Sequence, residues 1–476
     1  MADSVLTANK YKFFTVGAVG TFMATLDGSI LNVALPTISE KLNAPVSLVA
    51  WVVLSYSLTL ISLMLLFGAW TERKGYSFSY KFGYYFFIGG SILCAFSNSI
   101  YMLIFARVVQ AIGTSMFSAI GPGMVAEVFP DSERGKGMGL MMMMVAAGFM
   151  FGPPIGGFML SVWSWKSLFL INVPIGLFGL TLVQKYFKLL PPHQSKRKIP
   201  IKGGLAISIA LTTGVFMLKE LDGKLLSDPM VWGFGLVSLA ALIFFLKSES
   251  NPQTALIGLT IFKNRAFTTS ILSSTMQFVS TSGVFVLIPF YLERVRGFEP
   301  RQVGMFLIIL PILMFVFAPL AGKLSDRIGS RVLTTFGMVV TALGMFMFSG
   351  LQVDSSNLFI VGSLILVGIG IGTFSTPNSS AIMGSVHESQ RAVTSGILAT
   401  NRNIGMSVGI ALSTALYSYF DEKNALISDA KLRFVTSYRP VIFVGVALAV
   451  VGVAICLVKG EESKAHNPVD IGRYGK

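Results

Sequence analysis

Long apolar runs separated by short polar segments recur along the whole chain. An apolar run of about 20 residues is long enough to cross a bilayer as a helix. A window of about 19 residues finds such runs at residues 12–36, 48–68, 78–98, 101–125, 137–161, 167–187, 203–218, 229–247, 266–291, 302–321, 332–350, 357–383, 392–420 and 438–458. The pattern predicts an all-α polytopic membrane protein with fourteen spans, because a helix satisfies its own backbone hydrogen bonds in lipid.

The first apolar run carries a single carboxylate near its middle, Asp27. A charge at that depth costs several kcal/mol, so this side chain is expected to be paired, to face a cavity or to be protonated. Burial disfavours the charged form of a carboxyl group. Asp27 is therefore a candidate proton carrier, and the alternative is a structural hydrogen bond to a neighbouring helix.

The fourth apolar run carries a permanent cation, Arg107. Counting about 1.5 Å per residue from the predicted outer helix ends places Asp27 and Arg107 roughly 13 and 9 Å below the outer surface. The two charges are thus expected at similar depth, where they can pair directly or through water. The alternative for Arg107 is that its long side chain reaches the outer interface.

Composition narrows the class of protein. The chain is 53% hydrophobic and only 12% charged, about half the charged fraction of a soluble protein. The net charge of +15 does not indicate nucleic-acid binding, because Lys and Arg gather in alternate loops. That bias predicts cytoplasmic positions for both termini.

The sequence contains no motif that indicates an enzyme or an ATP-driven protein. Cys94 and Cys456 lie in apolar runs and form no disulfide framework or ligand cluster. We find no phosphate loop of the GxxxxGK[ST] type. We expect a protein that is not an enzyme and needs no metal or cofactor, with protons as the coupling ion.

The two halves of the chain resemble each other. Pro36 corresponds to Pro289, and the loop at 68–75 corresponds to the loop at 322–329. With Gly148 and Gly152, which correspond to Gly405 and Gly409, the offset is 253 to 257 residues. Such parallel repeats indicate two bundles related by an axis normal to the membrane. The predicted domains are an N-terminal six-helix bundle (1–188), a basic linker with two inserted helices (189–264), a C-terminal six-helix bundle (265–459) and a cytoplasmic tail (460–476).

Two repeated loops combine glycines with an acid and an arginine. Glycine lets helix ends come close, and the two charges can form a lock at a helix terminus. This pattern resembles the loop signature of the major facilitator superfamily, although the first copy has Glu for the usual Asp and Tyr76 where a basic residue is common. The resemblance implies a cytoplasmic gate formed by Gly68, Glu72, Arg73, Gly75, Gly322, Asp326, Arg327 and Gly329.

The fifth apolar run is rich in glycine and proline, which favours a kinked and closely packed helix. The string Gly148, Gly152, Pro153, Gly156 and Gly157 resembles the antiporter motif that marks exporters of the superfamily. The segments 26–36 and 165–176 are similar to the helix-1 signature and helix-6 entry of the fourteen-helix drug/proton antiporters.

This resemblance implies a major facilitator fold, two six-helix bundles plus two inserted helices, that exports amphipathic drugs or similar small molecules by alternating access. Asp27 and Arg107 would be the proton-linked pair. We expect a monomer in the plasma or bacterial inner membrane, whose partners are a small-molecule substrate and the lipid bilayer. The alternative is export of a defined endogenous lipid, siderophore or metabolite. A transport-inactive scaffold is disfavoured because the motifs are intact.

A second buried cation, Arg402, lies near the predicted middle of the thirteenth run between two asparagines. It could bind an anionic group or hold a counter-charge, and the alternative is a structural hydrogen bond between bundles. Further candidates to line a substrate cavity are Asn32, Tyr56, Phe149, Gln277 and Asn378.

Overall fold

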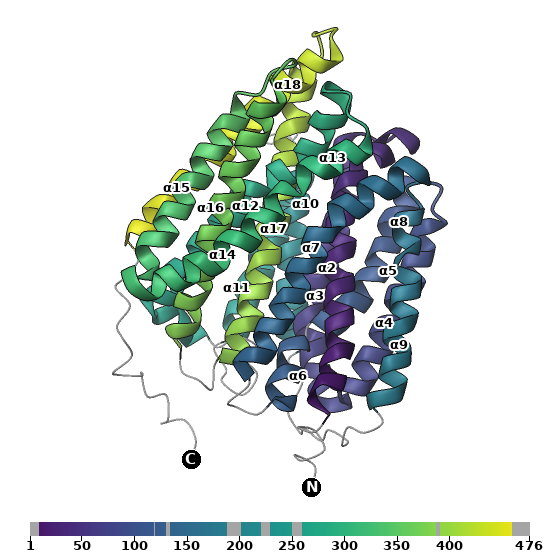
Figure 1. Ribbon diagram of the computed structural model, residues 1–476, viewed down its shortest axis with the longest axis vertical. Helices are drawn as coiled ribbons and strands as arrows, with labels where there is room; N and C mark the ends of the chain where they lie inside the picture. Colours follow the sequence, from purple (N-terminus) through teal and green to yellow (C-terminus); the bar gives the residue numbers. More distant parts are fainter. Residues whose placement is uncertain are drawn as a thin grey trace.

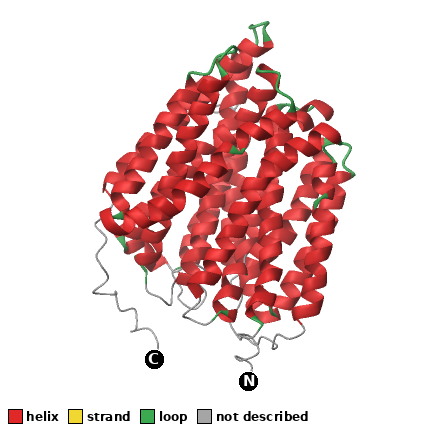
Figure 2. Ribbon diagram, viewed as in Figure 1, coloured by secondary structure: helices red, strands yellow, loops and turns green. Residues whose placement is uncertain are grey.

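The computed structural model describes residues 9–118, 120–129, 134–187, 201–219, 229–249, 259–386 and 391–458. These residues are helical almost throughout and include no strand (Figure 2). The predicted linker residues 188–200 and the predicted tail at 460–476 lie outside these ranges.

The first half of the chain supplies the helices α2 (Lys10–Lys41), α3 (Val46–Lys74), α4 (Tyr76–Ala95), α5 (Ile100–Ser118), α6 (Gly121–Val128), α7 (Arg134–Val162), α8 (Ser167–Leu170) and α9 (Asn172–Tyr186). The inserted pair is α10 (Ile201–Lys219) and α11 (Pro229–Ser248). The second half supplies η3 (Leu259–Lys263), α12 (Arg265–Phe290), η4 (Tyr291–Val295), α13 (Pro300–Leu307), α14 (Ile309–Ile328), α15 (Ser330–Ser349), α16 (Asn357–Gly384), α17 (Arg391–Lys423) and α18 (Ala430–Val458).

Every predicted span coincides with one helix or with two consecutive helical segments. Eleven segments among the described residues are long and apolar enough to cross a membrane, and α4, α10 and α17 are not among them. Helix α17 nevertheless runs for 33 residues. The polar residues Asn401, Arg402 and Asn403 in its interior lower its mean hydropathy.

The helices form two groups that lie side by side in Figure 1, the first half of the chain in purple and blue and the second half in green and yellow. In the first group α2 packs on α7 and α9, and α5 packs on α3 and α4. In the second group α12 packs on α17 and α18, and α16 packs on α14 and α15. Contacts between α7 and α13, α3 and α17, and α2 and α12 join the groups.

Two equivalent glycines show the repeat in backbone geometry. Gly75 ends α3 with φ 86° and Gly329 ends α14 with φ 87°. A side chain disfavours this left-handed conformation. Each glycine N–H closes the preceding turn, and each is followed at once by the next helix. We call the helix ends at these turns the inner ends and the opposite ends, near Pro36 and Pro289, the outer ends.

The outer ends of the two groups are in contact. Arg294 donates a hydrogen bond to Ser39 Oγ at 2.6 Å, and Thr37 donates one to Glu293 at 3.4 Å. One continuous apolar cluster includes Leu35 of α2 and Leu287 of α12. The outer side is therefore closed in this structure (top of Figure 1).

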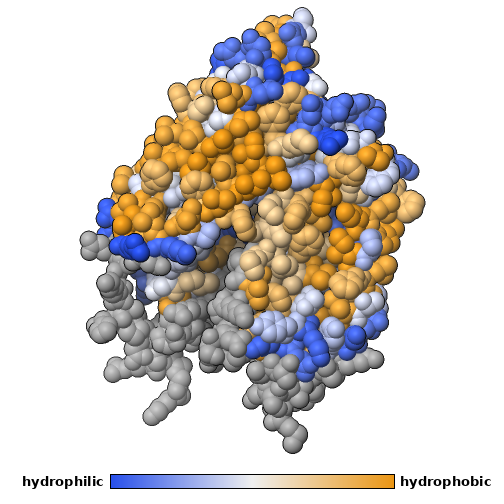
Figure 3. All heavy atoms as spheres, in the orientation of Figure 1, coloured by the Kyte–Doolittle hydropathy of each residue, from blue (hydrophilic) through white to orange (hydrophobic). Residues whose placement is uncertain are grey.

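The inserted helix α10 packs against both α3 and α17. Phe216 stacks on Trp51 with ring centroids 4.6 Å apart, and Ser208 donates a hydrogen bond to the carbonyl of Ser62. Helix α11 packs on α10 and leaves large apolar side chains exposed, such as Leu236. The molecule carries apolar side chains around its middle and hydrophilic ones toward its ends (Figure 3), as a bilayer requires.

Candidate functional site

The two charges predicted at similar depth are in direct contact. Arg107 Nη1 on α5 donates to Asp27 Oδ2 on α2 at 2.5 Å, and each side chain is only 1% exposed. Neither group faces lipid. A buried pair of this kind is costly to break, because removing one partner leaves the other charge uncompensated, at about 3–5 kcal/mol.

Two amides complete the surroundings of the Asp27 carboxylate. Gln110 and Asn172 donate to Asp27 Oδ1 at 2.9 and 2.7 Å. Gln110 also donates to Ser91 and accepts from Arg107. Helices α5 and α9 thus both hold the carboxylate of α2, which accepts hydrogen bonds from three side chains.

The arginine has partners besides the carboxylate. Its Nε donates to the carbonyl of Val52 on α3 at 3.2 Å. The aromatic ring of Tyr56 lies 4.0 Å from the guanidinium carbon, a cation–π geometry. Tyr56 in turn shares a hydrogen bond of 2.8 Å with Thr114. Arg107 therefore connects the carboxylate on α2 to helix α3.

Tyr56 also lies at the seam between the two groups. It packs with Leu60, Met64 and Ala111, and Ala399 of α17 packs against this cluster. The ring of Tyr56 therefore contacts Arg107 and belongs to a cluster that the second helix group also contacts.

The glycines of α7 adjoin the segment that carries Asp27. A Cβ atom at Gly148 would lie 2.9 Å from the nitrogen of Leu26, and one at Gly152 would lie 3.0 Å from the nitrogen of Ile30. The contact extends further, because Ser29 donates a hydrogen bond to the carbonyl of Gly148 at 2.9 Å. Glycine is required here for the backbones of α2 and α7 to approach so closely.

The same helix also contacts the second group. A Cβ atom at Gly157 would lie 2.6 Å from the carbonyl of Pro300 on α13, and Gly304 faces Pro153 with no room for a side chain. Gly156 instead faces Ile30 of α2. The glycines and prolines predicted as an antiporter motif therefore hold α7 between α2 and α13.

Two predicted cavity residues lie inside the second helix group. Gln277 donates to Thr341 at 3.3 Å and is 1% exposed. Asn378 donates to the carbonyl of Ser270 at 3.0 Å and is 2% exposed. Both amides join α12 to neighbouring helices, so neither presents an open surface to a cavity in this state.

The remaining predicted cavity residues, Asn32, Phe149 and Arg402, are partly exposed. Beside Arg402, Asn401 accepts a hydrogen bond from Thr275 on α12 at 2.7 Å. Asn401 also donates to the carbonyl of Ile271 on α12, so its hydrogen bonds lie within its own helix group and do not join the two bundles.

Among the predicted gate residues, Gly75 and Gly329 form the two tight turns described above. A Cβ atom at Gly322 would lie 3.0 Å from Thr376 of α16, so this glycine permits a close helix contact. Gly68 is partly buried and Arg327 is exposed. The side chains of Glu72, Arg73 and Asp326 lie outside the described part of the structure.

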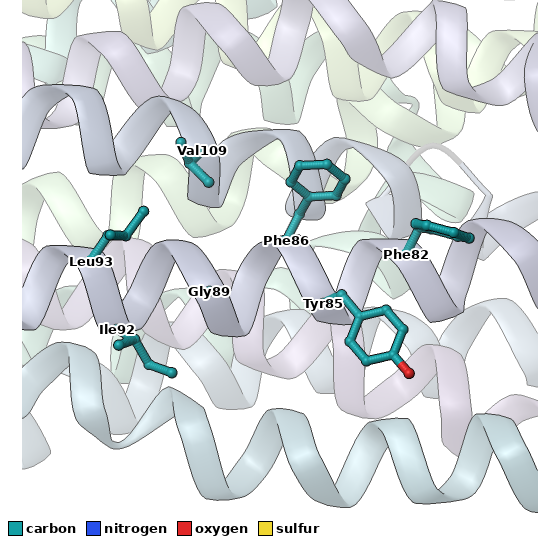
Figure 4. Close-up of a pocket in the computed structure, with 7 residues that line it drawn as sticks. All are labelled: Phe82, Tyr85, Phe86, Gly89, Ile92, Leu93 and Val109. Carbon is teal, nitrogen blue, oxygen red and sulfur yellow. The ribbon is translucent and has the colours of Figure 1, made fainter.

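An apolar groove of about 520 Å³ runs along α4 (Figure 4). Its lining consists of Phe82, Tyr85, Phe86, Gly89, Ile92, Leu93 and Val109. Exposed aromatic side chains on a membrane helix face lipid. The groove is therefore separate from the buried charges.

The sequence indicated two further residues of the site without assigning them a role. Gln110 follows Arg107 by three positions, which places both on one helix face. Asn172 lies in the helix-6 entry segment. Only the packing of α9 against α2 shows that its amide reaches Asp27.

The paired bundles and the buried charge pair define a membrane transporter. The profile described as Major Facilitator Superfamily matches residues 17–410 and also residues 271–473. The chain therefore belongs to the Major Facilitator Superfamily and is a multi-pass membrane transporter.

Several bacterial transporters are similar to the chain over most of its length. The riboflavin transporter RibZ of Clostridioides difficile is 32% identical over 409 residues, which cover 86% of this chain and 88% of that protein. The uncharacterized transporter YebQ of Escherichia coli is 32% identical over 430 residues, 90% and 93% of the two chains. The multidrug resistance protein Stp of Mycobacterium tuberculosis is 29% identical over 401 residues, 83% and 73%.

Solved structures share the fold at low sequence identity. A D-xylose-proton symporter superposes with a TM-score of 0.68 at 15% identity, covering 95% of this chain and 98% of that one. A bacterial homologue of the lysosomal transporter Spinster superposes with a TM-score of 0.66 at 15% identity, covering 95% and 96%.

Proposed function

We propose that the protein is a proton-coupled antiporter that exports amphipathic small molecules, of the fourteen-helix drug/proton antiporter branch. It would act as a monomer in the plasma membrane, with both termini in the cytoplasm. The observation that carries the proposal is the buried pair of Asp27 and Arg107. The name of the relative Stp, a multidrug resistance protein, supports the class of substrate.

The chemistry of coupling is the gain and loss of one proton at the Asp27 carboxyl. When the carboxyl is charged, it neutralises Arg107 and accepts from two amides. A proton on the carboxyl removes the negative charge, and an arginine cannot release its own proton. The buried guanidinium is then uncompensated, so protonation weakens the contact between α2 and α5 and lets the helices change their arrangement.

Tyr56 and α7 can transmit that change to the second helix group. The ring of Tyr56 rests on Arg107 and belongs to the cluster against which Ala399 of α17 packs. Helix α7 contacts both α2 and α13 through its glycines. A shift of α2 or Arg107 therefore acts on two of the contacts between the groups, α3 with α17 and α7 with α13.

Antiport follows if the transporter changes between its two conformations with either the substrate or the proton bound, but not with both. In the present state the outer ends are closed, so a substrate would enter from the inner side. Its binding would favour loss of the proton from Asp27. After the groups rock about the centre and the substrate leaves, a proton from the outer side would return the transporter.

Transport in liposomes tests this proposal. Purified protein in proteoliposomes is expected to accumulate a dye such as rhodamine B when a pH gradient is imposed, and to stop when the gradient is dissipated. Asp27→Asn is expected to lose the gradient-driven accumulation while it retains dye exchange between equal concentrations. Gradient-driven accumulation at the wild-type rate in Asp27→Asn would refute the coupling role.

A second candidate function is export of a defined endogenous metabolite by the same machinery. The name of the relative RibZ, a riboflavin transporter, favours it. The two candidates differ in breadth: a drug exporter accepts unrelated amphiphiles, whereas a metabolite exporter takes one compound and its analogues. Competition between unlike dyes for one binding site separates them.

A further inference from the structure

Arg402 lies in the interior of α17 and is partly exposed. Its guanidinium forms no ion pair or hydrogen bond with any residue that the structure describes. The two amides beside it are used elsewhere, since Asn401 pairs with Thr275 on α12 and Asn403 donates to the carbonyl of Ala399. A cation in the membrane interior requires a partner, so its partner is expected to come from outside the described chain.

The position of Arg402 on its helix places it between the two groups. At about 100° per residue, Asn401 and Gly405 share the face of α17 that packs on α12. Ala399 lies on the face that packs against the cluster of Tyr56, Leu60, Met64 and Ala111, in which α3 supplies the first three residues. Arg402 falls on the shorter arc between these faces, which opens between the two helix groups.

Among the side chains that the structure describes, no acid is placed to neutralise Arg402. Asp27 is the one acid in the interior of the long described helices, and it already pairs with Arg107. The other acids of these helices lie within the terminal turns or in η4. The described side chains of the central region therefore carry an excess positive charge, which repels cations and attracts anions.

We propose that Arg402 binds an anionic group of the substrate, so that this transporter moves amphiphiles that carry a carboxylate or a phosphate-like oxyanion, as anions or zwitterions. A guanidinium presents parallel N–H donors that match the oxygens of such groups. The apolar remainder of the substrate would lie against side chains such as Phe149. This inference rests on the proposed export function and specifies its substrate class.

Rhodamine B and its ethyl ester provide a matched pair of probes, because they share one dye core and differ by the free carboxylate. Fluorescence titration of the purified protein in nanodiscs is expected to show at least about tenfold tighter binding of rhodamine B. Arg402→Gln is expected to abolish this preference, and Arg402→Lys to keep part of it. Binding of rhodamine B no tighter than its ester in the wild type, including failure of both to bind, overturns the inference, as does an unchanged preference in Arg402→Gln.

Thermal unfolding without substrate provides an independent readout. An arginine without a protein partner can be replaced by methionine, which is similar in length, without loss of stability. Arg402→Met is therefore expected to unfold at the wild-type temperature or above it, whereas a decrease would reveal a protein partner and overturn the inference. The binding assay uses no pH gradient, so loss of proton coupling in liposomes and loss of anion preference are separate results.

Discussion

At the scale of single residues, the Asp27–Arg107 pair joins two side chains of which only one can change its charge. The carboxyl of Asp27 can take up a proton, whereas the guanidinium of Arg107 stays charged. Both side chains are 1% exposed, so neither can recruit bulk water when its partner is lost. This asymmetry makes the two single substitutions distinguishable.

Asp27→Asn is expected to destabilise the protein by about 3–5 kcal/mol, because it strands a permanent cation. Arg107→Gln is expected to cost less than Asp27→Asn, because a carboxyl that has lost its cation can be neutralised by a proton, whereas the guanidinium cannot lose its charge. Denaturant unfolding of both variants across pH measures the difference.

The double variant Asp27→Asn with Arg107→Gln completes a double-mutant cycle with the two single variants. It contains no buried charge at this site, so it is expected to recover much of the lost stability without recovering coupling. If the loss of stability in the double variant equalled the sum of the losses in the two single variants, a direct interaction between the two residues would be contradicted.

Tyr56 provides a second test at the residue scale. Tyr56→Phe keeps the ring over Arg107 and removes only the hydrogen bond to Thr114, so we expect a loss of about 1 kcal/mol in stability and near-normal transport. Tyr56→Ala removes a ring that packs on Arg107 and belongs to the cluster that contacts α17, and is expected to reduce gradient-driven transport strongly. Equal transport by both variants would remove Tyr56 from the coupling route.

The sequence predicted the two buried charges but only some of the side chains that contact them. A charge inside an apolar run is visible without a structure, and helix geometry suggested a common depth for Asp27 and Arg107. The amide of Asn172 could not be placed, because its contact depends on how α9 is rotated against α2. Gln277 is a second example. The sequence shows a polar residue in an apolar helix, but not whether its amide lines a cavity or bonds to Thr341 on a neighbouring helix, as it does here.

At the scale of elements, α7 is the helix that both groups share. Its glycines remove the side chains that would separate it from α2 and from α13. Without a hydrophobic force between helices in lipid, such close packing is a main source of association. The position of α7 therefore depends on single methyl groups.

Alanine at Gly152 is expected to push α7 away from Ser29 and Ile30, at a cost of about 1–3 kcal/mol, and to slow transport. The matched control is Gly28→Ala on α2, where a Cβ atom would have nothing within 4 Å. Transport rates and unfolding of the two variants make the comparison. Equal rates would show that the close contact of α7 and α2 does not limit transport.

Apolar runs predicted the existence of the helices better than their ends and breaks. The first helix continues past Pro36 to Lys41, because a proline near the end of a helix in lipid removes only one backbone bond. The fourth and tenth spans are each divided into two helices, as at α13 and α14. Hydropathy does not detect such breaks, since the residues on both sides remain apolar.

At the scale of the whole molecule, the two halves of the chain are built alike and meet at their outer ends. The repeat was visible in the sequence as matching prolines and loops, and Gly75 and Gly329 now show nearly identical φ angles. The outer contact, in which Arg294 bonds Ser39, joins residues far apart in the sequence that no local pattern could pair. Alternating access requires this contact to open.

A covalent bridge across the outer ends is expected to stop transport. Ser39→Cys with Arg294→Cys, joined by a short bismaleimide, would hold the outer side closed and abolish accumulation of dye in proteoliposomes. Each single cysteine variant treated with the same reagent serves as the control, and the native Cys94 and Cys456 are buried. Undiminished transport by the bridged protein would contradict opening at this end.

The central claim is that the substrate and a proton on the Asp27 carboxyl compete for binding to the protein. The most direct measurement is the number of protons released into weakly buffered solution when a transported substrate is added to the purified protein. We expect the wild type to release protons in proportion to bound substrate, and Asp27→Asn to bind the substrate and release none. Release of the same number of protons by the Asp27→Asn protein would contradict the account.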